Sequence, residues 1–160
     1  MLPIRTILHP TDFSRQSGSA FQVARSLARD HNSRLVILYV RGPTVVGYGE
    51  LGAVVPDPIQ TPNDVKERLI AEHMIESRTE IECRVAEGDP AVEIVRTAND
   101  LGASMIVMGT HGRSGLSRLL LGSVAEVVLR KAACPVLTVK APFPAAVAES
   151  VSAVEEAVAI

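Results

Sequence analysis

Residues 35–40, with the sequence LVILYV, are the segment that decides the fold. The run is continuously apolar and rich in β-branched residues, which is typical of a strand covered by helices on both faces. Residues 105–108, with the sequence MIVM, have the same character. Two such runs in one chain favour a parallel sheet that is buried between two layers of helices.

Segments typical of strands and of helices alternate along the rest of the chain. Ser14 is a candidate N-cap, and Pro62 and Pro90 each follow a capping residue, as at the first position of a helix. Gly102 is a natural stop for the third helix. The alternation predicts an α/β fold: a five-stranded, parallel, doubly wound sheet of the Rossmann type, with helices on both faces. The predicted strands cover residues 4–9, 35–40, 80–86, 105–108 and 136–139, the first of them ending at Pro10. The predicted helices begin after Ser14, at Pro62, at Pro90 and at Ser123, and the second runs to about Ser77.

The composition excludes several classes of protein. Of the 160 residues, 47% are apolar and 21% charged, which fits one globular domain rather than a disordered chain. A net charge of -2 and an aromatic content of 3% argue against nucleic acid as a partner. No signal-peptide layout and no membrane-length apolar run is apparent, so we expect no membrane association and a cytoplasmic location. Cys83 and Cys134 form no CxxC pair, and packing roles are expected for them rather than redox or metal roles.

The composition changes after Lys140, which suggests two regions. Residues 1–140 are predicted to form the folded domain, and residues 141–160 are an extension with prolines at positions 142 and 144. Valines at 147, 151, 154 and 158 have heptad-like spacing. The extension is therefore either a short amphipathic helix that docks on the domain or on a partner, or a frayed tail.

The strongest chemical signal is the loop 109–123, with the sequence GTHGRSGLSRLLLGS, directly after a buried strand. In open parallel sheets, ligands bind beyond the carboxyl ends of the strands. The glycines allow close approach of a ligand, and Gly122-Ser123 opens a helix whose N-terminus favours an anion. His111, Arg113 and Arg118 add donors and positive charge. The pattern favours a phosphate chain over the alternative of a glycine-rich turn with an ordinary N-cap.

A second signal is Pro10-Thr11-Asp12, after the first predicted strand. The Asp12 carboxylate suits an adenine amino group, ribose hydroxyls or a nucleotide-bound divalent ion. The alternative is an aspartate that only caps the next helix. If the first and fourth strands are neighbours, Asp12 and Gly109 face one crevice.

Other nucleotide and catalytic motifs are absent or out of context. Residues 47–52 match G-x-G-x-x-G but lead into prolines rather than a helix, so a loop is the better interpretation. The sequence holds no P-loop lysine motif, no H-E-x-x-H zinc motif and no G-x-S-x-G nucleophile elbow.

Taken together, these motifs resemble the ATP-binding branch of the universal stress protein family. The pattern Gly109-x2-Gly112-x9-Gly122-Ser123 resembles the family's nucleotide-binding signature, and residues 10–14 resemble its first-strand motif. Residues 134–139 are similar to its last strand. The resemblance covers about residues 2–140, although residues 63–77 look short for the family's second helix.

The resemblance implies the strand order 3-2-1-4-5 and a bound ATP, ADP or AMP, with Mg²⁺ as a candidate companion ion. It places the adenine and ribose near Pro10, Thr11, Asp12 and the backbone of Val40. The phosphates would lie against the loop and the helix that follows it. The complete expected binding set is Pro10, Thr11, Asp12, Val40, Met108, Gly109, His111, Gly112, Arg113, Gly122, Ser123 and Val124. A homodimer through the last strand, Val136–Val139, is also implied.

Three functions remain open at this point. The first is an adenine-nucleotide-binding stress-response or regulatory module that acts as a homodimer and is read by a protein partner. The second is a slow ATPase or phosphotransferase, although no catalytic base or P-loop lysine is present. The third is a nucleotide-free dimerising scaffold, which the intact glycines disfavour. We therefore expect binding rather than catalysis, and we assign no catalytic residue.

Overall fold

A computed structural model describes residues 3–42, 58–73, 81–110 and 121–140. Several sequence predictions concern residues outside these ranges. They are the contacts of His111, Gly112 and Arg113, the end of the second helix after His73, and the extension 141–160.

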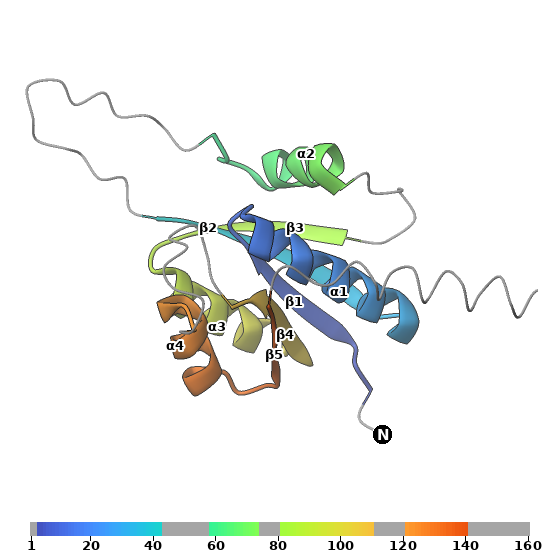
Figure 1. Cartoon of the computed structure of the whole chain (residues 1–160), viewed down its shortest axis with the longest axis vertical. Helices are drawn as coiled ribbons and strands as arrows, with labels where there is room; N and C mark the ends of the chain where they lie inside the picture. Colours follow the sequence, from blue (N-terminus) through green and yellow to red (C-terminus); the bar gives the residue numbers. More distant parts are fainter. Residues whose placement is uncertain (1–2, 43–57, 74–80, 111–120, 141–160) are drawn as a thin grey trace, which may run out of the picture.

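The described residues form one five-stranded sheet with the order β3-β2-β1-β4-β5, and all neighbouring strands are parallel (Figure 1). The strands are β1 (Thr6–Thr11), β2 (Arg34–Arg41), β3 (Ile81–Glu87), β4 (Met105–Gly109) and β5 (Val136–Val139). The helices are α1 (Arg15–His31), α2 (Pro62–His73), α3 (Pro90–Asp100) and α4 (Ser123–Lys131). The predicted doubly wound α/β fold and its strand order are confirmed.

Two layers of helices cover the sheet, with α1 and α2 on one face and α3 and α4 on the other (Figure 1). Strand β2 contributes to both cores. Leu35, Ile37 and Tyr39 pack under α1 and α2, and Val36 and Leu38 pack under α3 and α4. Each of these residues is at most 5% exposed. An unbroken apolar run is required here because neither face of the strand meets water.

The helix starts follow the predicted caps. The Ser14 hydroxyl accepts a hydrogen bond from the Ser17 amide, and the Asp89 carboxylate accepts one from the Val92 amide. At α2, the Asp64 carboxylate accepts from the Thr61 amide and the Thr61 hydroxyl accepts from the Asp64 amide, a reciprocal capping box. Hydrogen bonds from the backbone amides of Gln60 and Thr61 lower the pKa of Asp64. Gly102 ends the α3 region in a left-handed conformation (φ 57°), as predicted.

The end of the first strand was predicted wrongly. The strand continues through Pro10 to Thr11, pairing with β2 along its whole length. With β4 it pairs only at Ile7 and Leu8. Pro10 lies beyond the residues that pair with β4. The absence of an N–H at Pro10 therefore costs no hydrogen bond to β4.

His9 marks the place where β1 and β4 separate. Its side chain is fully buried, and its Nδ1 lies 2.8 Å from the carbonyl oxygen of Val107 on β4. Because a carbonyl oxygen only accepts, Nδ1 carries the hydrogen of this bond. At this point a hydrogen bond from the His9 side chain, rather than one between backbone groups, connects β1 to β4.

None of the helices within the described part of the chain is long and apolar enough to span a bilayer.

Gly109 lies at a close packing contact between β4 and α1. A Cβ atom at this position would lie 3.2 Å from the backbone carbon and oxygen of Gln16 on α1. From the sequence, the expected role of this glycine is to let a ligand approach the backbone closely. The structure shows a second role, because β4 passes close to α1 at this residue. Backbone atoms cannot yield as the end of a flexible side chain can.

We predict that Gly109→Ala lowers the free energy of unfolding by about 1–3 kcal/mol, because α1 must shift away from β4. Urea denaturation of the nucleotide-free protein measures the change. Gly42→Ala is the matched control, since a Cβ at Gly42 would meet nothing within 4 Å. Equal effects of the two substitutions would contradict the packing explanation.

Candidate functional site

A crevice of about 380 Å³ opens at the carboxyl ends of β1, β2 and β4, where the strand order reverses. The structure brings together every expected binding residue that it describes. These are Pro10, Thr11, Asp12, Val40, Met108, Gly109, Gly122, Ser123 and Val124. The volume lies in the range of small-molecule sites.

Further lining residues were missed by sequence reasoning. They are Ser17, Leu38, Tyr39, Gly42, Pro90, Ile94, Thr110 and Ala125. Pro90 and Ile94 come from the start of α3, which follows β3 at the same edge of the sheet. In a parallel sheet, every helix that follows a strand begins at the carboxyl ends of the strands, where ligands bind. The predicted helix start at Pro90 could therefore have been used to predict Pro90 as a lining residue. Ser17 is one turn inside α1, and nothing in the sequence separates it from an ordinary serine of a helix.

The N-terminus of α4 forms one wall of the crevice. Its N-cap is Gly122, which makes no side-chain cap hydrogen bond, whereas Ser14 and Asp89 cap α1 and α3 with their side chains. The Gly122 amide donates to the Thr110 carbonyl at 2.7 Å, which fixes the entry into the helix. The first turn of α4 therefore presents its positive end to the crevice without an acceptor from the N-cap side chain.

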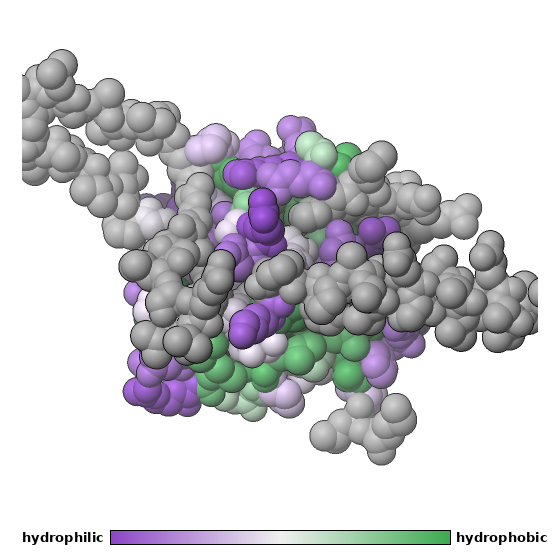
Figure 2. Space-filling model, in the orientation of Figure 1, coloured by the Kyte–Doolittle hydropathy of each residue, from purple (hydrophilic) through white to green (hydrophobic). Residues whose placement is uncertain are grey.

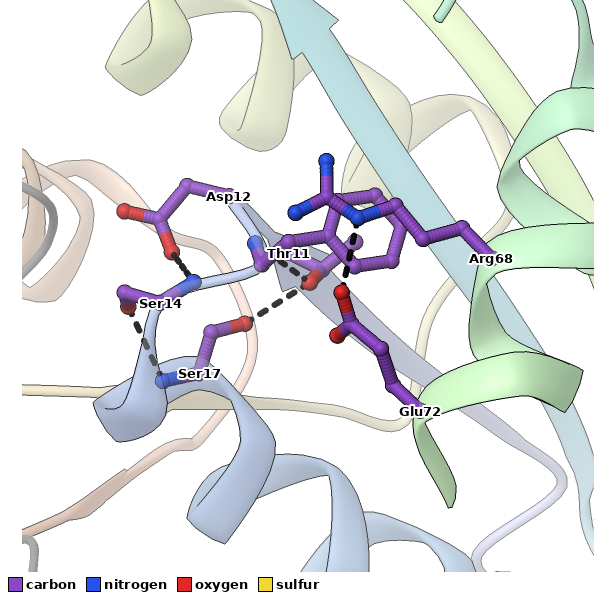
Figure 3. Close-up of polar contacts among 7 residues, drawn as sticks. Thr11, Asp12, Ser14, Ser17, Arg68 and Glu72 are labelled. Carbon is purple, nitrogen blue, oxygen red and sulfur yellow. Dashed lines mark hydrogen bonds and ion pairs between the residues drawn. The ribbon is translucent and has the colours of Figure 1, made fainter. Parts of the chain in front are cut away.

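The opposite wall is the turn between β1 and α1 (Figure 3). Asp12 Oδ1 accepts a hydrogen bond from the Ser14 amide at 2.9 Å. Thr11 Oγ1 accepts from the Phe13 amide at 3.1 Å and from the Ser17 hydroxyl at 2.8 Å. The N-cap of α1 is Ser14, so Asp12 is not the helix cap that the sequence left open as an alternative. Among the described lining residues, Asp12 is the only one with a formal charge at neutral pH.

Phe13, at the centre of this turn, has a left-handed backbone conformation with a φ of 58°. Bulky residues rarely adopt this region, which costs roughly 1–2 kcal/mol. Its ring packs against Tyr39, with 5.8 Å between centroids, and the Arg68 guanidinium of α2 lies 4.2 Å from the ring centroid. Aromatic packing and the cation–π contact offset the backbone strain.

In the described part of the chain, the cysteines and other potential metal ligands do not gather into a cluster. No group of three or more His, Cys, Asp or Glu side chains is placed to hold a metal ion within the described ranges. Burial raises the pKa of the Cys83 thiol and that of the Cys134 thiol. Both thiols contact hydrophobic core residues, which agrees with the packing role expected for them.

Comparisons with known proteins identify the relatives of this chain. The profile of the Universal stress protein family matches residues 3–140. Universal stress protein MJ0531 of Methanocaldococcus jannaschii is 36% identical over 141 residues, which cover 86% of this chain and 83% of that protein. Universal stress protein YxiE of Bacillus subtilis is 34% identical, covering 81% and 94% of the two chains.

Solved structures agree with the observed architecture. The structure of MJ0577, from Methanocaldococcus jannaschii, has a TM-score of 0.65 at 29% identity and covers 87% of this chain and 97% of its own. A universal stress protein in complex with cAMP has a TM-score of 0.60 at 25% identity, covering 86% and 98%.

The strain at Phe13 is open to direct measurement. Phe13→Ala and Phe13→Gly both remove the ring, but only glycine adopts the left-handed region without penalty. We predict that Phe13→Ala destabilises the protein by about 1 kcal/mol more than Phe13→Gly does. Urea denaturation of both variants gives this difference. An alanine variant as stable as the glycine variant would show that the turn carries no strain.

Proposed function

The chain belongs to the universal stress protein family, and we propose that its crevice binds an adenine nucleotide. The observation that carries the proposal is the pairing of two opposite features across one crevice. The uncapped N-terminus of α4 suits phosphate, and the Asp12 carboxylate suits hydrogen-bond donors of the base or ribose. The similar protein solved in complex with cAMP supports an adenine nucleotide as the ligand.

On the phosphate side, the proposed contacts come from the backbone amides of the first turn of α4 and from the Ser123 hydroxyl. Ser123, Val124 and Ala125 all line the crevice. Backbone N–H groups at a helix N-terminus bind phosphate oxygens without needing a lysine. On the basis of the sequence resemblance, we also propose Gly112, His111 and Arg113 as residues that contact the phosphates.

On the base side, the wall is mostly apolar. Pro10, Val40, Ile94 and Met108 line it, and the Val40 backbone carries amide and carbonyl groups. A flat, apolar purine ring fits such a wall, with a few polar groups giving its orientation. Asp12 lies on the turn just beyond β1, where we place the ribose. If a divalent ion accompanies the phosphates, Asp12 is our candidate protein ligand for it.

We infer a binding module rather than an efficient enzyme. The described lining residues include no histidine and no lysine, and we assign their one carboxylate, that of Asp12, to the base and ribose rather than to the activation of water. Nucleotide binding then acts by stabilising one state of the protein over another, which a protein partner reads.

We propose that the protein forms a homodimer through β5. The two edge strands of the sheet differ in charge. The face of β3 toward α3 carries Glu82 and Arg84, and Glu82 pairs with Arg34 and with Arg84. The hydrogen bond from Arg34, which has the larger effect, and that from Arg84 both lower the pKa of Glu82. Charged side chains protect an edge from pairing with another chain.

By contrast, the edge strand β5 carries no charge over Val136–Val139. Leu137 of β5 and Leu129 of the adjoining helix α4 are 37% and 42% exposed. Figure 2 shows a hydrophobic band on the part of the surface where Figure 1 places β5. An apolar, uncharged edge strand with an exposed leucine of its own is suited to pairing with a second copy.

Gly122→Asp tests the phosphate site. The N-cap backbone is extended (φ -61°, ψ 149°), so an aspartate there caps α4 with its own side chain. We expect unchanged or slightly higher stability, and ATP affinity at least about tenfold lower because the new carboxylate repels the phosphates. Isothermal titration calorimetry with ATP measures the affinity.

Two controls separate charge from space. Gly122→Asn has a similar shape without the charge, so it should retain more ATP affinity than Gly122→Asp. Adenosine lacks phosphate, so its affinity should change equally in both variants. ATP binding that is unaffected by Gly122→Asp would exclude the proposed phosphate site, and a wild-type protein that binds no adenine nucleotide would exclude the proposed function.

Leu137→Lys tests the dimer. We expect the introduced lysine to weaken the association at least tenfold without unfolding the domain, because two like charges would meet across the paired edge. Sedimentation equilibrium over a range of concentrations measures it. Ile70→Lys is the matched control, since Ile70 is similarly exposed (47%) but lies on α2. If both substitutions weakened the association equally, or if neither weakened it, β5 would not be the interface.

A further inference from the structure

We propose that Arg68, which does not line the crevice, is a positioning residue for Asp12. Its guanidinium holds Phe13 in the left-handed conformation, and the turn so formed sets the direction of the Asp12 carboxylate. This inference rests on the proposed function, because it assigns how one wall of the nucleotide site is kept in place.

The contacts form a short chain from α2 to the crevice. The Arg68 guanidinium lies 4.2 Å from the centroid of the Phe13 ring. The Phe13 amide donates to Thr11, and the next amide along the chain, that of Ser14, donates to Asp12. The backbone angle of Phe13 lies between these two bonds, so a change in that angle moves the Ser14 amide relative to the Asp12 carboxylate.

Arg68 is itself held in a defined orientation. Its Nε donates to Glu72 Oε1 at 2.8 Å, one turn further along α2. Its neighbour Leu69, like Val65 one turn before, is at most 1% exposed and anchors the helix in the core. Figure 3 shows Arg68 extending from α2 toward the turn, with the Asp12 carboxylate on the side away from α2. The docking of α2 is thereby linked to a site that α2 does not line in the described part of the chain.

The planar guanidinium explains why arginine suits this position. It stacks flat on an aromatic face while donating in its own plane, which the ammonium group of lysine does not do. Arg68→Gln should therefore release Phe13, Arg68→Lys should restore part of the contact, and Glu72→Gln should leave the guanidinium over the ring.

The first arm of the test needs no ligand. NMR chemical shifts of the Ser14 amide and of the Asp12 carboxyl carbon are compared in wild type, Arg68→Gln, Arg68→Lys and Glu72→Gln. We expect clear shifts at both positions in Arg68→Gln, smaller ones in Arg68→Lys and the smallest in Glu72→Gln. Arg130→Gln is the matched control, because it breaks another i,i+4 pair with glutamate that is remote from the turn. Unchanged Ser14 and Asp12 signals in Arg68→Gln would overturn the proposal.

The second arm measures ATP affinity by calorimetry. We expect Arg68→Gln to weaken binding about fivefold and Arg130→Gln to have no effect. In an Asp12→Asn background, Arg68→Gln should cause no additional loss, because the effect passes through Asp12. An equal loss in both backgrounds would overturn the positioning role. If wild-type protein binds no ATP, the proposed function fails, and the NMR arm still decides whether Arg68 positions Asp12.

Discussion

The separation of β1 from β4 after Leu8 is the constraint on which the candidate site depends. The backbone ladder between these strands ends there, Pro10 has no N–H to continue it, and the buried His9 ring bonds to the Val107 carbonyl instead. Because β1 stays paired with β2 to Thr11, the strand keeps its direction while one of its sides opens. The crevice therefore arises from the separation of two strands of the sheet, and the surrounding turns form its walls.

Those walls are built by different means. The α4 wall depends on a missing side chain, since a glycine N-cap leaves the helix end for another acceptor. The β1–α1 wall depends on several hydrogen bonds and on an aromatic ring held between two elements. One wall thus needs little stabilisation, while the other needs packing from α2 to maintain an unfavourable backbone angle. This difference makes the Asp12 side of the crevice the more sensitive one to changes elsewhere in the chain.

Much of the fold was predictable because local signals and global packing agree. Two local patterns show this agreement. The apolar run of β2 reflects burial of both faces of the strand, and Ser14 and Asp89 cap the first amides of their helices. The extension of β1 through Pro10 was not predictable, because it depends on where a neighbouring strand stops pairing. Neither was the backbone angle of Phe13, because the contacts of its ring with Tyr39 and Arg68 join residues that lie far apart in the sequence. The candidate site was found through its glycines and Asp12, but the packing reason for Gly109 appears only once α1 lies over β4.

The unequal edges of the sheet also have a consequence for the proposed association of two copies of this chain. A sheet with two uncharged edges is a repeating unit, to which further chains can add at either end until a fibre results. Here β3 carries Glu82, Arg84 and Glu87, while β5 carries no charge. When two β5 edges pair, the extended sheet is bounded on both sides by β3. In the proposed dimer, growth by strand addition would end at two copies, because the charges of β3 disfavour a further partner at either outer edge.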